Sequence, residues 1–219
     1  MKTISHRISY YNQNDIKQIP LSLEKNIDFF EIDVQLCKDG LVIFHDYNLE
    51  KKGVYKNITE YTINELESYN IQSLDMLLKV LKAHNNLNIM LDIKGHNEKI
   101  VGLLYKSLND YNNTNNTRFL IQSFNHYIID LLRRFLKCKN STIEYGYLIS
   151  GYMNIYWDTY TKNIDYVCID NEFVAKYISR IEKPLYVYNC NHENELNCSK
   201  DKVVGIVTDF PNNFSISDN

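Results

Sequence analysis

The sequence predicts an α/β protein whose strands and helices form a (β/α)8 barrel. Short apolar stretches recur along the chain, and eight of them have the length and composition of buried strands. Most of them are followed by a polar loop and then by an amphipathic segment with helical spacing. Alternating strands and helices indicate a parallel sheet, and eight strands match the number in a closed barrel. An open, doubly wound sheet has the same periodicity and remains an alternative here.

The chain has 219 residues, of which 44% are hydrophobic. This is enough for one sizeable core and short for two, so we expect a single domain over residues 1–219. Its five cysteines are scattered and odd in number, which favours a reducing compartment over a disulfide framework. The sequence contains neither a signal-peptide pattern nor an apolar run of about 18 residues. We therefore expect a cytoplasmic protein.

The charge pattern bears on the class of partner. The formal net charge is −3, and no basic run is interleaved with aromatic residues, so no nucleic-acid partner is expected. The many tyrosines fit packing in strands and loops as easily as an aromatic rim for lipid, and no stable membrane association is expected. A small-molecule substrate is the remaining expectation, and the oligomeric state stays open.

The first expected elements are a strand at residues 2–6, a helix at about residues 21–25 and a second strand at residues 29–35. Apolar and acidic residues alternate in the second strand, so Glu31 and Asp33 project from one face, about 7 Å apart at the base. Two carboxylates on one face indicate a cation site. For so short a pattern alone, solvated acids on a half-exposed edge hairpin are the better explanation.

A hairpin is expected directly after this strand. An Asp-Gly signal within residues 37–40 marks the turn, and residues 41–44 form an extra antiparallel strand. Pairing Leu36 with Leu41 across the turn sets His45 opposite Ile32. A one-residue bulge or slip would then bring His45 to the same face as the two acids.

The rest of the chain continues the alternation. Residues 47–61 are expected to form a loop, after which Thr62 and Ser73 cap helices at residues 63–66 and 74–83. Residues 87–94 form a strong strand that ends in an acid and a base. The remaining elements are helices at 98–109, 126–135, 153–161 and 172–181, and strands at 119–123, 145–149, 166–170, 185–189 and 203–209.

Polar residues gather at one end of the expected strands. Because (β/α)8 barrels carry their sites at the carboxyl ends of the strands, these residues would share one rim. They are His6, Glu31, Asp33, Lys94, Ser123, Asn189 and Asp209. For the last three, an ordinary polar strand end explains the position equally well.

Several ordered motifs resemble the glycerophosphodiester phosphodiesterase family, within the superfamily of phosphatidylinositol-specific phospholipase C-like barrels. The motifs are His6-Arg7, Glu31-Ile32-Asp33-Val34, Lys38-Asp39-Gly40, His45-Asp46, Asp92-Ile93-Lys94, Gln122-Ser123-Phe124, Tyr186-Val187-Tyr188-Asn189 and Gly205-Ile206-Val207-Thr208-Asp209-Phe210-Pro211. Each motif is weak alone, but together they occur in the family's order over nearly the whole chain.

The resemblance implies metal-assisted cleavage of a glycerophosphodiester or a related small lipid-derived diester in a TIM barrel. It implies that Glu31, Asp33 and Asp92 hold one divalent cation, Mg²⁺ or Ca²⁺. It further implies that His6 and His45 act as the catalytic acid and base. Arg7 and Lys94 would contact the non-bridging oxygens of the substrate phosphate.

Departures from the family pattern leave two alternatives open. Asp92 stands where the family usually has Glu, Ile8 stands where it usually has Gly, and the family's P-E-N-T motif is missing after Ile8. Asp at the third acidic position resembles sphingomyelinase D, which implies a lyase that forms a cyclic phosphate. The missing motif suggests instead a catalytically silent barrel with a binding or structural role.

Overall fold

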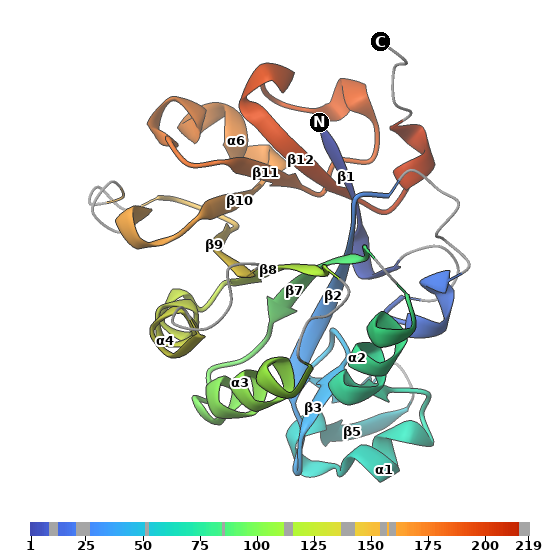
Figure 1. Cartoon of the computed structure of the whole chain (residues 1–219). Helices are drawn as coiled ribbons and strands as arrows, with labels where there is room; N and C mark the ends of the chain where they lie inside the picture. Colours follow the sequence, from blue (N-terminus) through green and yellow to red (C-terminus); the bar gives the residue numbers. More distant parts are fainter. Residues whose placement is uncertain are drawn as a thin grey trace.

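Eight parallel strands form a closed barrel. The computed structural model describes residues 1–8, 13–20, 27–50, 53–84, 86–111, 116–136, 143–153, 157 and 161–214. Strand β1 pairs with both β12 and β2, which closes the ring (Figure 1). The predicted barrel is therefore confirmed, and the open-sheet alternative is wrong. Its strands are β1 (Lys2–Ser5), β2 (Phe29–Leu36), β7 (Asn88–Ile93), β8 (Arg118–Ser123), β9 (Ile143–Ile149), β10 (Tyr166–Asp170), β11 (Leu185–Tyr188) and β12 (Val203–Thr208).

Alternation along the strands separates an inner cluster of side chains from an outer core. The inner cluster consists of Ile4, Phe29, Met90, Leu120, Leu148, Tyr166, Cys168, Tyr186 and Val207. In β2, Phe29 belongs to this cluster whereas Phe30 and Ile32 belong to the outer core, as a period of two requires. Glu31 and Asp33 follow Phe29 on the inner face. The inner apolar side chains therefore fill the barrel below the polar ones.

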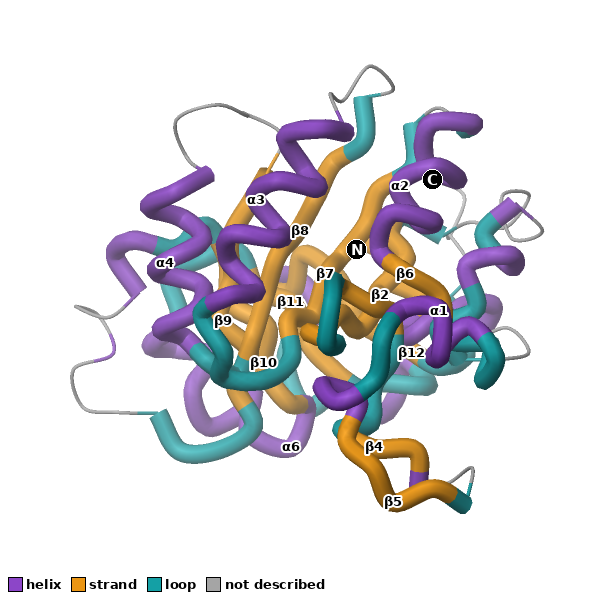
Figure 2. The backbone as a smooth tube through the Cα atoms, turned by 90° about the horizontal axis from the view of Figure 1, so that it is seen from below, coloured by secondary structure: helices purple, strands orange, loops and turns teal. Residues whose placement is uncertain are grey.

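In the described part of the chain, the outside of the barrel is covered by helices α2 (Leu74–Ala83), α3 (Lys99–Tyr111), α4 (His126–Leu136) and α6 (Asn171–Tyr177) (Figures 1 and 2). Ser73 caps α2 by accepting a hydrogen bond from the Met76 amide, as its position predicts. The helix predicted at 172–181 ends at Tyr177 and continues as a 3-10 turn. The helix predicted at 21–25 lies outside the described residues, as does most of the one predicted at 153–161.

The extra antiparallel strand is present as β3 (Leu41–Ile43), and β6 (Gln72–Ser73) pairs with its other edge. Leu36 pairs with Leu41, which is the predicted register. Strand β3 ends at Ile43, however, so His45 is not held in the ladder opposite Ile32. The turn after the strand brings His45 to the acids, and the predicted bulge or slip does not occur in β3.

Residues 47–61 are not the loop that the sequence predicts. They include β4 (Asn48–Leu49), β5 (Val54–Asn57) and a 3-10 turn, and α1 (Ile63–Glu67) follows. Leu49, Ile58 and Leu66 are buried in a small cluster against the β2–β3 hairpin. Their isolated positions in the sequence lack the periodicity that predicts a strand, so the pairing of β4 with β5 could not be predicted from the local sequence and is stabilised by this buried cluster.

Short 3-10 helices occupy several connections. They span His6–Ile8, Ile16–Gln18, Ile58–Glu60, Thr161–Asn163, Ile178–Arg180, Glu193–Glu195, Lys200–Lys202 and Pro211–Asn213. Within the described part of the chain, no helix combines the length and the apolar character needed to cross a bilayer.

The inner packing predicts opposite effects for two Gly→Ala substitutions. A Cβ at Gly146 in β9 would overlap with the fully buried ring of Tyr166, so Gly146→Ala should lower the free energy of unfolding by about 1–3 kcal/mol. Gly102 lies on α3 with open space around it, and Gly102→Ala should raise the free energy of unfolding by up to about 1 kcal/mol. Urea unfolding of both variants measures these changes. Equal stabilities would contradict the inner packing described above.

Candidate functional site

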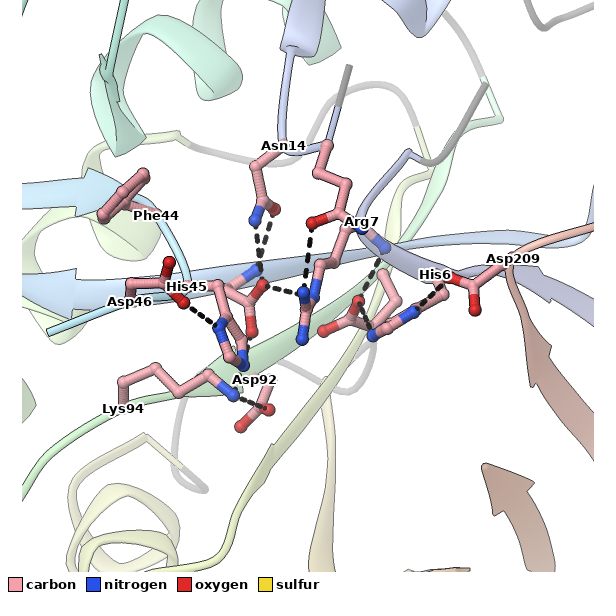
Figure 3. A network of polar contacts seen from close by, with 12 residues as sticks. His6, Arg7, Asn14, Phe44, His45, Asp46, Asp92, Lys94 and Asp209 are labelled. Atoms are coloured by element: carbon pink, nitrogen blue, oxygen red, sulfur yellow. Dashed lines mark hydrogen bonds and ion pairs between the residues drawn. The ribbon is translucent and has the colours of Figure 1, made fainter. Parts of the chain in front are cut away.

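A cavity of about 240 Å³ opens among the carboxyl ends of the barrel strands. All seven predicted site residues line it, from segments that are far apart in the sequence: His6, Arg7, Glu31, Asp33, His45, Asp92 and Lys94. The wall is completed by Gln122, Phe124, Leu148, Tyr188, Asn189 and Val207. The fold thus brings the candidate residues together, while their individual roles stay predictions (Figure 3).

Three buried carboxylates form the acidic part of the cavity. One oxygen of each of Glu31, Asp33 and Asp92 lies within 4.8 Å of the others. Asp33 and Asp92 are direct neighbours in the register of β2 and β7, and Glu31 lies two residues earlier on the same face of β2. Asp92 Oδ1 is buried and has no hydrogen-bond partner among the described residues.

Burial and mutual repulsion perturb these acids. Burial, together with the charges of Asp33 and Asp92, raises the pKa of Glu31 well above its usual value. Burial and the charge of Asp33 also raise the pKa of Asp92, against the opposing effect of Lys94. For Asp33, burial alone would raise the pKa, but the Lys94 charge and hydrogen bonds, the Asn14 hydrogen bond and the Arg7 charge together lower it.

The acids fit a hard divalent cation. All three donors are carboxylate oxygens, the ligand type that Mg²⁺ and Ca²⁺ prefer. The unpaired Asp92 Oδ1 is a buried acceptor, which is costly unless it is satisfied. Two nearby cationic side chains balance only two of the three carboxylates when all three are ionised. A divalent cation would give Asp92 Oδ1 a partner and would supply the missing positive charge.

The two cationic side chains contact the acids directly. Lys94 Nζ lies 2.9 Å from Asp33 Oδ1 and 2.5 Å from Asp92 Oδ2, and Arg7 Nε lies 3.3 Å from Asp33 Oδ2. Burial disfavours the charged form of Lys94, but the two carboxylates outweigh burial and raise the pKa of its ammonium group. The sequence predicts phosphate contacts for both cations. In the structure they neutralise the predicted metal ligands.

The backbone after His6 adopts an uncommon conformation. Arg7 and Ile8 have φ values of 51° and 54°, in the left-handed region that glycine adopts most easily. The Arg7 amide donates to Glu31 Oε2 at 2.8 Å, and the Arg7 carbonyl accepts from the Asn14 amide at 2.6 Å. Glycine is therefore favourable after the His-Arg pair, whereas Ile8 offsets the strain by burying its side chain in the outer core.

Each of the two histidines is held by a carboxylate. His6 Nδ1 lies 2.7 Å from Asp209 Oδ1, and His45 Nδ1 lies 2.7 Å from Asp46 Oδ1. An ionised carboxylate only accepts hydrogen bonds, so Nδ1 of each neutral ring carries the hydrogen and Nε2 is the atom that can accept a proton. His6 Nε2 lies 4.0 Å from Glu31 Oε2. Both rings line the same cavity.

The sequence did not assign several residues that support this site. Asp209 was one of several polar strand ends, and no local signal connects it with His6, which is 203 positions away. Asn14 lies between the expected strand at residues 2–6 and the expected helix at residues 21–25, and its side chain donates to Asp33 Oδ2 at 2.8 Å and accepts from the Asp33 backbone amide at 3.2 Å. Asp46 follows His45 directly in the sequence, so the His-Asp pair itself was a signal that could have identified Asp46 as the partner of His45.

Comparison with known sequences identifies relatives. The sequence profile of the "Glycerophosphoryl diester phosphodiesterase family" matches residues 8–213. A glycerophosphodiester phosphodiesterase of Caldanaerobacter subterraneus subsp. tengcongensis is 30% identical over 152 residues, 58% of this chain and 60% of that protein. The protein YhdW of Bacillus subtilis is 27% identical over 117 residues, 46% of this chain and 47% of YhdW. The chain thus spans less than two thirds of either relative.

A solved structure extends the likeness of the fold to almost the whole chain. An Oleispira antarctica phosphodiesterase in complex with the product sn-glycerol-3-phosphate aligns with a TM-score of 0.81 over 96% of this chain and 94% of that one. Its sequence identity to this chain is 20%. At this identity the likeness establishes a common fold.

The buried ion pairs predict a stability change for Lys94→Met. Because this substitution leaves Asp33 and Asp92 without their ammonium partner, it should lower the free energy of unfolding by about 3–5 kcal/mol in metal-free buffer. Adding Mg²⁺ or Ca²⁺ should restore part of the loss, because a cation replaces the missing charge. Urea unfolding measures both effects. The control is Lys79→Met at an exposed position on α2, and equal losses in the two variants would contradict this account.

Proposed function

Because the chain belongs to the glycerophosphoryl diester phosphodiesterase family, we propose that it is a metal-dependent phosphoric diester hydrolase. Its substrate would be a glycerophosphodiester or a related small diester derived from a lipid. The main support is that three buried acids, two carboxylate-held imidazoles and two cationic side chains line one cavity. The product sn-glycerol-3-phosphate in the Oleispira antarctica structure further supports a small phosphate ester.

Glu31, Asp33 and Asp92 would hold one divalent cation, Mg²⁺ or Ca²⁺. When bound, such a cation polarises a phosphoryl oxygen and offsets the negative charge that develops during cleavage. The three acids come from rigid strands and are buried, so their positions are fixed before any ligand binds.

Arg7 and Lys94 would bind the non-bridging oxygens of the substrate. Arg7 offers forked donors and Lys94 offers a point charge. With all three carboxylates ionised, these acids, the two cationic side chains and one divalent cation would carry a net formal charge of +1. A singly charged phosphodiester would neutralise this total.

His6 and His45 would move the protons. One imidazole takes the proton from the attacking nucleophile, which is water in a hydrolysis, and the other gives a proton to the leaving alkoxide. In the structure Nδ1 of each ring is hydrogen-bonded to a carboxylate, so Nε2 is left to transfer the proton. Asp209 and Asp46 would stabilise the protonated ring after it accepts a proton.

Phosphorus NMR of the purified protein tests the reaction. The substrates are glycerophosphocholine, lysophosphatidylcholine and sphingomyelin, each with Mg²⁺, with Ca²⁺ and with EDTA. We expect a phosphate monoester from glycerophosphocholine in the presence of a divalent cation and no product in EDTA. A cyclic phosphate product would support the lyase alternative. No turnover with either cation would support a silent barrel and contradict the proposal.

Two substitutions test the residue roles. Asp92→Asn removes a charged ligand and His45→Ala removes a proton-transfer group, and each should lower kcat at least about 100-fold. Matched controls are Asp75→Asn at an exposed position on α2 and His96→Ala at an exposed position outside the cavity. Both controls should keep kcat within about twofold. Full activity of either test variant would contradict the role given to that residue.

A further inference from the structure

The loop between β11 and β12 carries an asparagine that contacts Asp209 in two ways. The Asn191 side-chain amide donates from Nδ2 to Asp209 Oδ2 at 3.4 Å, and its Oδ1 accepts from the Asp209 backbone amide at 2.9 Å. The same Oδ1 also accepts from Thr208 Oγ1 at 3.1 Å. One side chain therefore fixes both the backbone and the carboxylate of Asp209.

Asp209 needs such support because it lies beyond the end of β12. Its side chain is 30% exposed, and burial alone does not hold its carboxylate. One carboxylate oxygen lies 2.7 Å from His6 Nδ1, and the other accepts from Asn189 Nδ2 at 3.3 Å as well as from Asn191. Asn189 Nδ2 also lies 3.1 Å from His6 Nδ1, but an Nδ1 that donates its hydrogen to the Asp209 carboxylate cannot accept from this amide. The contacts on the second oxygen fix the rotation of the carboxylate. They thereby fix the direction in which the first oxygen meets His6.

Asn191 is itself held in place. Its backbone amide donates to Glu195 Oε2 at 3.0 Å, and its carbonyl accepts from Asn213 Nδ2 at 3.0 Å. The preceding Cys190 is fully buried, and its amide donates to the Val207 carbonyl at 3.1 Å, which extends the contact between the two strand ends. The loop can therefore act as a rigid support for Asp209.

We infer that Asn191 is a positioning residue for His6, acting through Asp209. It holds the Asp209 carboxylate in the orientation that keeps the His6 hydrogen on Nδ1 and leaves Nε2 as the proton acceptor in the cavity. The inference rests on the proposed function insofar as His6 is a catalytic group. A residue that merely closes the loop would affect stability and leave the His6 tautomer unchanged.

The matched control for Asn191→Ala is Asn197→Ala in the same loop. Asn197 also donates from its side chain, to the Asn171 carbonyl at 2.9 Å, but it does not line the cavity. Nitrogen-detected NMR of the histidine rings reads the tautomer of His6 in the absence of substrate, and the spectrum of His6→Gln identifies its resonances. Steady-state kinetics with glycerophosphocholine gives kcat and KM.

We expect wild-type His6 to be protonated at Nδ1. In Asn191→Ala the two tautomers should mix, and kcat should fall about tenfold with KM within about twofold. Asn197→Ala should keep the wild-type His6 spectrum and kcat. An unchanged His6 spectrum in Asn191→Ala, or an equal loss of kcat in both variants, would overturn the inference.

A second substitution, Asn191→Asp, covers the case in which Asn191→Ala does not fold. It retains the oxygen that accepts from Thr208 and the Asp209 amide but replaces the donor with a negative charge that repels the Asp209 carboxylate. It should alter the His6 spectrum in the same direction as Asn191→Ala. Because the spectra need no substrate, an inactive wild type with the predicted spectra would overturn the proposed function only. An active wild type whose His6 spectrum does not respond to either substitution would overturn the inference only.

Discussion

Mutual repulsion of three buried carboxylates is the constraint on which the site depends. Glu31, Asp33 and Asp92 are each at most 5% exposed, and one oxygen of each lies within 4.8 Å of the others. Burial makes each charge more costly and strengthens its interactions with its neighbours. The surrounding residues serve to balance this charge: Lys94 and Arg7 contact the acids, Asn14 donates to Asp33, and the Arg7 amide donates to Glu31. The same imbalance suits the acids to a divalent cation.

The balancing contacts explain why the segment after His6 is strained. To donate its amide to Glu31, Arg7 must leave the strand direction immediately after β1, and both Arg7 and Ile8 take left-handed conformations. Such conformations cost roughly 1–2 kcal/mol per residue and persist only where other contacts determine them. Here the contacts are the Glu31 carboxylate, the Asn14 amide and the burial of Ile8. Isoleucine at position 8, where the family usually has glycine, is thus compatible with the contacts that hold Glu31.

The two histidines reach similar environments by different routes. His45 obtains its carboxylate from the next residue in the chain, so a short motif contains the whole pair. His6 obtains its carboxylate from the opposite end of the chain, because β1 and β12 are neighbours in the closed ring. The fold of the barrel therefore places a carboxylate beside His6, whereas His45 has one beside it in the sequence. Pairing of β11 with β12 brings the loop after β11, with Asn189 and Asn191, against Asp209.

Local periodicity determined most of the fold and the acidic half of the site. Alternation in Glu31-Ile32-Asp33-Val34 set both acids on one face, and the Asp-Gly turn set the register of β2 and β3, because these patterns need only neighbouring residues. Tertiary structure alone decided that the sheet closes, that β4 pairs with β5, that Lys94 contacts Asp33 and Asp92, and that Asp209 meets His6. Those outcomes depend on contacts between residues distant in the sequence, whose free energies appear only when the whole barrel is assembled.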